Sequence, residues 1–153
     1  MSAERNLVTV TEAIWVDRPP EAVFDYTQDY TRRTEWDASI SEASVLSISP
    51  RAARVAVPGL GRTTVVYQLD RRPERTSAVF QDIESRWVTG GGGSWRYEPE
   101  AGGTRWTETN TIELRRTWLM RLLAPVVAWN VRRSTRRAMA EAKRRLEVES
   151  PAL

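Results

Sequence analysis

From about Thr117 to Glu147 the apolar residues recur at spacings of three and four, which is the period of an α-helix. Arginines occupy much of the remainder, so one side of this segment is apolar and the other is charged. The pattern predicts one long helix, and Pro125 marks the place where it would bend. Such a helix has to bury its apolar side against a layer formed by the residues that precede it.

The start of the chain predicts one strand followed by two short helices. Leu7 to Val16 alternates with a period of two, as a strand does. Residues 17–21 contain two prolines, which end a strand and suit the first turn of a helix. A short amphipathic helix with Val23, Phe24 and Tyr26 on its apolar side is expected to follow. Asp29 to Trp36 is predicted to be a second short helix or helical turn.

Between residues 40 and 114, short runs of strand-forming residues alternate with turn signals rich in glycine and proline. The connections are too short for the crossovers of parallel strands, so these runs predict an antiparallel meander. The expected strands are Ile40 to Ile48, Ala53 to Val57, Thr63 to Leu69, Ser77 to Ile83, Trp87 to Thr89 continuing to Trp95 to Glu98, and Arg105 to Leu114.

The run Gly90 to Gly93 interrupts one of these strands. It lacks the Lys-Ser or Lys-Thr that follows a phosphate-binding loop, and no helix comes after it. We expect a flexible hairpin or a bulge, with a mobile lid over a cavity as the alternative.

Together these elements predict an α+β fold in a single domain, residues 1–153. A curved antiparallel sheet of about seven strands would wrap around the C-terminal helix of about residues 117–147, with two short helices after the first strand.

The composition removes several classes of chemistry. The chain has no cysteine and no histidine, so disulfides, thiol nucleophiles, imidazole bases and Cys or His metal sites are excluded. Its acidic residues do not follow the spacing of a calcium loop, and we expect neither a metal nor a cofactor. The segment Met1 to Asn6 is short and polar, unlike a signal peptide, and the apolar stretch Leu122 to Trp129 is too short to span a bilayer. A cytoplasmic location is the expectation.

Positive charge is concentrated at the C-terminal end. The formal net charge is −4 for residues 1–114 and +7 for residues 115–153. The arginines of the terminal helix would suit nucleic acid or an anionic membrane surface. They also suit the solvated side of an amphipathic helix, and this is the interpretation adopted, since no nucleic-acid motif accompanies them. We expect no nucleic-acid partner, no stable membrane insertion, and a monomer or homodimer.

Four segments resemble the helix-grip superfamily, which comprises START-like and polyketide cyclase/dehydrase-like domains. They are Val16 to Tyr26, Arg33 to Asp37, Gly103 to Thr107 and Ala142 to Glu147, and they keep the order that the family uses. The resemblance implies a tunnel between the long helix and the sheet that holds an apolar or polycyclic ligand. It specifies the scaffold rather than the activity, because related domains include cyclases, aromatases, lipid and hormone carriers, and binding proteins.

Two glutamates are the candidate catalytic residues. Glu12 shares a face of its strand with Val8, Val10, Ile14 and Val16, so its carboxylate is expected to face inward. Glu108 and Asn110 lie on the apolar face of the last strand, and the first and last strands of such a sheet are commonly neighbours. Two close carboxylates would form an acid and base pair for an enolisation, aldol-type cyclisation or dehydration. Alternatively, Glu12 turns to solvent at a bulge or pairs with an arginine on a neighbouring strand, and Glu108 pairs with Arg96 or Arg105.

Large aromatic side chains are the other candidate ligand contacts, because they offer apolar area together with a polar group. For each of them, packing in an ordinary core is the alternative. The residues expected to contact a ligand are Asn110, Tyr67, Trp87, Trp95, Tyr97, Trp106, Met120 and Val127.

The leading functional hypothesis is a polyketide cyclase/dehydrase-like protein that folds a small apolar or polycyclic molecule in its cavity and assists proton transfer with carboxylates. The alternative is a carrier or sensor of a lipid or other hydrophobic metabolite without catalysis, in which Glu12, Glu108 and Asn110 only anchor a polar group.

Overall fold

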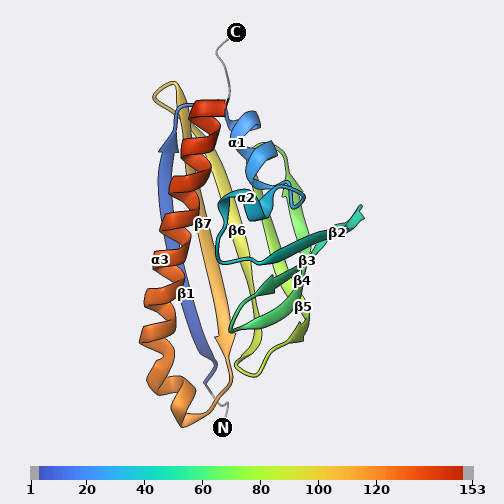
Figure 1. The fold of residues 1–153 in the computed structure, drawn as a ribbon, viewed down its shortest axis with the longest axis vertical. Helices are drawn as coiled ribbons and strands as arrows, with labels where there is room; N and C mark the ends of the chain where they lie inside the picture. Colours follow the sequence, from blue (N-terminus) through green and yellow to red (C-terminus); the bar gives the residue numbers. More distant parts are fainter. Residues whose placement is uncertain (1–3, 150–153) are drawn as a thin grey trace.

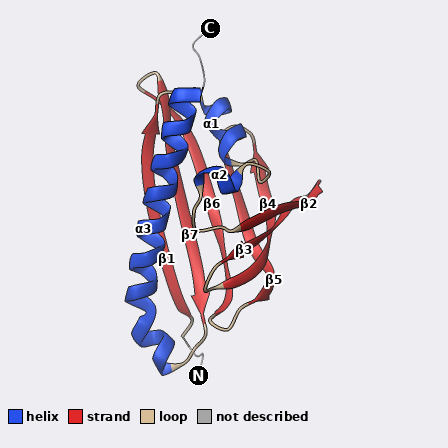
Figure 2. Cartoon of the chain, in the orientation of Figure 1, coloured by secondary structure: helices blue, strands red, loops and turns tan. Residues whose placement is uncertain are grey.

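The computed structural model describes residues 4–149. Residues 1–3, which belong to the N-terminal segment considered above for a signal peptide, and residues 150–153 lie outside the described residues. The elements are β1 (Asn6–Val16), α1 (Pro20–Thr27), α2 (Arg33–Trp36), β2 (Glu42–Ile48), β3 (Arg51–Val57), β4 (Gly61–Arg71), β5 (Arg75–Glu84), β6 (Val88–Glu100), β7 (Gly103–Leu114) and α3 (Trp118–Glu149) (Figures 1 and 2).

The seven strands form one antiparallel sheet in the order β1-β7-β6-β5-β4-β3-β2. Each strand from β2 to β6 pairs with the next strand along the chain, and β1 pairs with β7. The helix α3 runs alongside β1 over one face of the sheet, while β2 to β5 curve away from it (Figure 1). The predicted α+β helix-grip arrangement, with two short helices after the first strand and a long C-terminal helix, is confirmed.

Some boundaries differ from those expected. The helix α2 has four residues and begins at Arg33 rather than at Asp29. Hydrogen bonds from Thr31 to the Asp29 carboxylate hold the preceding residues in a turn instead. The helix α3 continues through Pro125. Within residues 4–149, no helix is both long enough and apolar enough to cross a membrane.

The glycine run belongs to β6, so the expected hairpin is wrong; a bulge is present between Val88 and Gly90. At two of its positions a side chain would collide with the backbone of a neighbouring strand. An ideal Cβ at Gly91 would lie 2.3 Å from the carbonyl oxygen of Thr111, and φ of Gly91 is +141°. A Cβ at Gly92 would lie 2.3 Å from the carbonyl oxygen of Ala78. Glycine at these positions therefore lets the backbones of β5, β6 and β7 approach closely in the bent sheet.

The apolar core between the sheet and the helices is divided into two clusters. The larger cluster lies beneath α1, α2 and the second half of α3, where Trp36, Tyr97, Trp106 and Met139 are almost fully buried. The smaller cluster lies near the beginning of α3 and consists of Val8, Val10, Ile112, Leu114 and Met120. The two clusters leave the middle of the sheet less completely filled.

The glycine geometry generates a stability prediction. Gly91→Ala should lower the free energy of unfolding by about 1–3 kcal/mol, because the new methyl group meets a backbone oxygen at a strained φ. Gly90→Ala is the matched control, since its Cβ would meet only the Glu113 side chain at ordinary contact distances of 3.6–3.8 Å. Urea unfolding of both variants measures the difference. Equal stability of the two would contradict the close-approach explanation.

Candidate functional site

A cavity of about 610 Å³ lies between the two apolar clusters, under the middle of α3. This volume is within the range of small-molecule sites. Its lining is contributed by β3 to β7, by α3, and by α2 with the residues that flank it. The apolar lining residues include Val55, Val65, Phe80, Ile83, Trp95, Ile112, Val127, Val131 and Ala138.

Solvent-exposed lining residues mark the mouth of the cavity. Ala38 comes from the connection between α2 and β2, Pro58 and Gly59 from the turn between β3 and β4, and Asn130 from α3. The mouth is therefore bordered by two loops and by one helix that also covers the sheet.

A polar group interrupts the apolar lining on β7. The Glu108 side chain is almost completely buried, and its Oε1 accepts a hydrogen bond from Nδ2 of Asn110 at 3.1 Å. The same Nδ2 lies 3.5 Å from Oγ1 of Thr135 on α3. Both residues point inward because the alternation of β7 places them on the face that carries Trp106 and Ile112.

A buried ion pair from α2 stands beside this group. Nε of Arg33 donates to Oδ2 of Asp37 at 3.1 Å, and Nη2 of Arg33 lies 3.9 Å from Oε1 of Glu108. The other oxygen of Asp37 accepts hydrogen bonds from the backbone N–H and the hydroxyl of Ser39. One guanidinium thus stands between two carboxyl groups at the cavity wall.

The environment shifts the pKa of Glu108 and the pKa of Arg33. Burial raises the pKa of Glu108 above its ordinary value and the Asp37 carboxylate adds to this, although Arg33 and Asn110 act in the opposite direction. The nearby indole N–H of Trp95 also lowers the pKa of Glu108, although this N–H does not form a hydrogen bond in the structure. Burial lowers the pKa of Arg33, but Asp37, followed by Tyr30 and Glu108, outweighs it and the net pKa of Arg33 is raised.

The site has unused hydrogen-bonding capacity. Nη1 of Arg33 is buried and has no hydrogen-bond partner. A buried donor without a partner is energetically costly, so it favours an acceptor atom brought by a ligand. Arg33 and Glu108 both line the cavity, so with Glu108 protonated a modest turn of the Arg33 side chain would present two donors to a carbonyl or hydroxyl oxygen.

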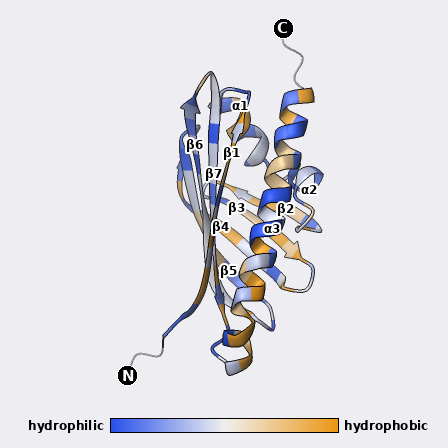
Figure 3. Ribbon diagram, turned by 90° about the vertical axis from the view of Figure 1, so that its left-hand side faces the viewer, coloured by the Kyte–Doolittle hydropathy of each residue, from blue (hydrophilic) through white to orange (hydrophobic). Residues whose placement is uncertain are grey.

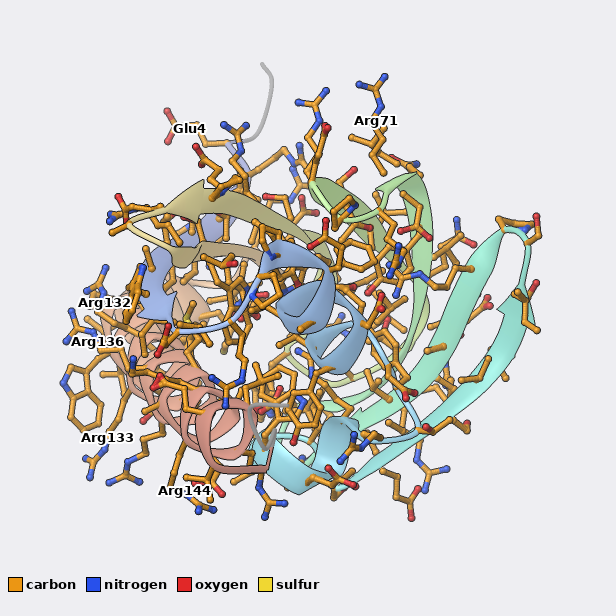
Figure 4. The ribbon with its side chains drawn as sticks, turned by 90° about the horizontal axis from the view of Figure 1, so that it is seen from above. Glu4, Arg71, Arg132, Arg133, Arg136 and Arg144 are labelled. Atoms are coloured by element: carbon orange, nitrogen blue, oxygen red, sulfur yellow. The ribbon has the colours of Figure 1, made fainter. Side chains whose placement is uncertain are left out.

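The structure places Glu12 directly opposite Glu108 in the register of β1 and β7, which agrees with the neighbouring strands expected above. Its carboxylate, however, pairs with Arg136 at 3.0 Å and Arg132 at 3.4 Å, both on the outer side of α3 (Figure 4). Among the described residues that line the cavity, Glu12 is absent. The arginine partners come from the helix rather than from a neighbouring strand.

The residues expected to contact a ligand fall into two sets. Asn110, Trp95 and Val127 line the cavity together with Glu108. The other five are not in the cavity lining formed by residues 4–149. Tyr67, Tyr97 and Trp106 belong to the larger core cluster, Met120 belongs to the smaller one, and Trp87 is partly exposed before β6. Tyr97 hydrogen-bonds Thr27 and Gln28, and Tyr67 bonds Tyr30 and Gln28, so these hydroxyls are already occupied. A role for any of the eight in ligand binding stays a prediction.

Sequence reasoning missed Arg33 and Asp37. Arg33 begins a helix of one turn and Asp37 directly follows it, and in so short a segment no period of apolar residues can indicate which side faces inward. The available signal was the spacing itself, since an Arg and an Asp at i and i+4 form an ion pair on a helix.

The raised pKa of Glu108 predicts a pH dependence of stability. The unfolded state loses this proton near the ordinary pKa of 4.5, whereas the folded state retains it to higher pH. The stabilisation from the proton is therefore complete below that pKa and is lost as pH rises to the folded pKa; each tenfold difference in proton affinity between the two states contributes about 1.4 kcal/mol. Glu108→Gln abolishes the effect, so its stability relative to the wild type should rise between pH 4 and pH 8 in urea unfolding.

Glu113 offers the control of opposite sign. Arg5 lowers the pKa of this carboxyl, so its stabilisation is present above the ordinary pKa and disappears as pH falls. Glu113→Gln should therefore lose stability relative to the wild type as pH rises. If both variants change in the same direction, Glu108 does not have a raised pKa.

Solved structures share this architecture at low sequence identity. The protein TTHA0849 from Thermus thermophilus superposes with a TM-score of 0.79 at 20% identity, covering 94% of this chain and 99% of that one. The Zhui aromatase/cyclase from Streptomyces sp. R1128 gives 0.76 at 16% identity, with 95% and 99% covered. A START superfamily protein from Mycobacterium smegmatis gives 0.69 at 15% identity, with 93% and 99% covered. These likenesses establish the START-like helix-grip fold.

The sequence itself matches a family profile. No curated protein sequence matches the chain. The family described as polyketide cyclase / dehydrase and lipid transport matches residues 8–147. Because this match covers nearly the whole chain, the protein belongs to the polyketide cyclase/dehydrase and lipid transport family.

Proposed function

We propose that the protein binds a small, largely apolar molecule carrying a carbonyl or hydroxyl oxygen, and that Glu108 donates a proton to that oxygen. The reaction class is a cyclisation or dehydration of the polyketide cyclase/dehydrase type. The observation that carries the proposal is a buried carboxyl group with a raised pKa beside an unpartnered guanidinium N–H in an apolar cavity.

The chemistry requires little more from the protein. An apolar cavity holds a flexible substrate in a folded conformation, and this alone lowers a barrier by several kcal/mol. Protonated Glu108 can hydrogen-bond a carbonyl oxygen and favour the enol form, or protonate a hydroxyl group that leaves as water. The Glu108 carboxylate formed by this proton transfer can then take the proton that the adjacent carbon loses. Arg33 remains cationic throughout, because the Asp37 carboxylate raises its pKa, and it stabilises negative charge on the substrate oxygen.

This proposal changes the pair of acidic groups expected from the sequence. Glu12 is engaged by two arginines and faces the helix α3, whereas Asp37 lies in the cavity lining with Glu108. We therefore propose Glu108 as the proton donor and Asp37 as the group that holds Arg33 in place.

Two naphthalenes of nearly equal shape test the binding step. 2-Acetylnaphthalene carries a carbonyl group and 2-ethylnaphthalene does not. The wild type should bind the ketone about fivefold more tightly, since one net hydrogen bond contributes about 1 kcal/mol. Glu108→Leu should reduce this preference to nearly one while retaining affinity for the hydrocarbon. Fluorescence titration of the ligands measures both constants.

A blocked cavity provides the control for location. Val131→Trp fills the lining from α3 and should weaken binding of both ligands at least about tenfold. Ala140→Trp places the same side chain on an exposed position of α3 outside the lining and should leave binding unchanged. Equal effects of the two substitutions would place the ligand outside this cavity, and an unchanged preference in Glu108→Leu would remove Glu108 from the oxygen contact.

A carrier function is the second candidate, favoured by the ion pairs that keep Glu12 away from the cavity and leave the expected carboxylate pair incomplete. Native mass spectrometry of freshly purified protein should reveal the natural ligand, which can then be incubated with the protein. If the protein is an enzyme, Glu108→Gln should lower turnover at least about tenfold, whereas Glu12→Gln should not. Recovery of the molecule unchanged with the wild type would establish a carrier and contradict the catalytic proposal.

A further inference from the structure

The first half of α3 has a second apolar side that the fold does not use. Trp118, Leu122, Val126 and Trp129 follow one another at spacings of four, four and three, which places them on one side of the helix. Their exposed fractions are 77%, 67%, 53% and 56%. The neighbouring Leu119 and Leu123 are also exposed, so apolar residues gather around the beginning of α3 (Figure 3).

This surface differs from the part of α3 that covers the protein interior. Met120, Val127 and Val131 contact the smaller core cluster or line the cavity, on the opposite side of the helix. A helix that covers one sheet needs only one apolar side. Exposed apolar residues in a continuous patch, as opposed to scattered ones, indicate a contact surface.

The charge around the patch is strongly positive. Residues 114–140 contain no acidic residue, and they contain the arginines Arg115, Arg116, Arg121, Arg132, Arg133, Arg136 and Arg137. The guanidinium of Arg133 lies 5.2 Å from the centre of the Trp129 ring, so charge and aromatic surface are next to each other. Arg132, Arg133 and Arg136 all lie on the outer side of α3 (Figure 4). Glu12 pairs with Arg132 and Arg136, and Arg121 donates to the backbone carbonyl of Glu4. With seven arginines in the segment, these neighbouring acidic residues leave an excess of positive charge.

We infer that residues 118–133 of α3 dock reversibly on an anionic lipid surface. Exposed tryptophans among leucine and valine enter the region between lipid head groups and acyl chains. Arginines beside them attract acidic head groups. A second copy of this chain would repel the same surface electrostatically, because its patch carries the same charge. The attachment is peripheral, since no helix within residues 4–149 spans a bilayer.

The position of the patch gives the docking a consequence. Asn130 and Val131 of the same helix segment line the cavity near its mouth. Docking by residues 118–133 would therefore hold the mouth close to the lipid surface, where apolar molecules are dissolved. The docking itself does not depend on whether the cavity carries out a reaction.

Vesicle sedimentation of the full chain tests the inference. At roughly 0.1 M salt the protein should sediment with phosphatidylcholine vesicles that contain about 30% phosphatidylglycerol, and remain in solution with pure phosphatidylcholine. Raising the salt to about 1 M, where the Debye length is about 3 Å, should release most of it. Absence of binding to the anionic vesicles at the lower salt overturns the inference.

Two variants separate the apolar and charged contributions. One variant removes apolar area and combines Trp118→Ser, Leu122→Ser and Trp129→Ser. The other reverses charge and combines Arg121→Glu with Arg133→Glu. Each should lower the vesicle partition coefficient at least about tenfold. The control for the serine variant combines Val45→Ser, Leu46→Ser and Ile48→Ser, which replace exposed apolar side chains of β2. The control for the charge reversal combines Arg71→Glu with Arg96→Glu, at exposed positions away from α3. The controls should bind as the wild type does.

Each contrary result has a definite meaning. If charge reversal abolishes binding but the serine variant binds normally, the surface recognises a polyanion such as nucleic acid and the inference is wrong. It is also wrong if sedimentation equilibrium finds a dimer that the serine variant loses, because the patch is then an interface between copies. All substituted positions are exposed, and thermal melting of each variant verifies that it is folded.

Discussion

The packing of α3 along β1 sets the limits within which the rest of the structure is arranged. This helix lies over one edge of a seven-stranded sheet, whereas the strands from β2 to β5 curve away from it. A single helix cannot fill the space enclosed by so wide a sheet. Apolar contacts at each end of α3 close that space above and below, and the remaining volume becomes the cavity.

The place of the cavity follows from one row of polar residues across the inner face of the sheet. Glu12 of β1 is opposite Glu108 of β7, and Asn110 follows Glu108 on the same face of β7. Apolar residues lie on both sides of this row, and they form the two separate clusters. A buried carboxyl group needs polar partners, so apolar side chains cannot close over it as they do elsewhere. The two glutamates meet this need differently: Glu12 reaches arginines at the surface, and Glu108 relies on Asn110 and a buried arginine.

The sequence was sufficient for the fold and for the neighbouring positions of Glu12 and Glu108, because strand alternation and helical period report which faces are apolar. It was insufficient for Arg33 and Asp37, since one helical turn has no period to read. The roles of Tyr67 and Tyr97 also depended on partners far away in the sequence: Gln28 contacts both hydroxyls, and nothing in a strand pattern indicates that contact. The hairpin expected at the glycines of β6 was wrong for another reason, because a turn signal and a close approach between strands have the same composition.

Val126 and Val127 show why α3 has more than one task. These adjacent residues are both apolar, but Val127 lines the cavity and Val126 is exposed to solvent. Covering the sheet explains why Val127 is apolar, but it does not explain why Val126 is. An exposed Trp118 or Trp129 likewise adds nothing to the folded core. Retaining large apolar side chains on a surface surrounded by arginines carries a risk of aggregation that charge alone reduces. An anionic lipid surface is the environment in which the apolar and the cationic parts of this segment are both satisfied at once.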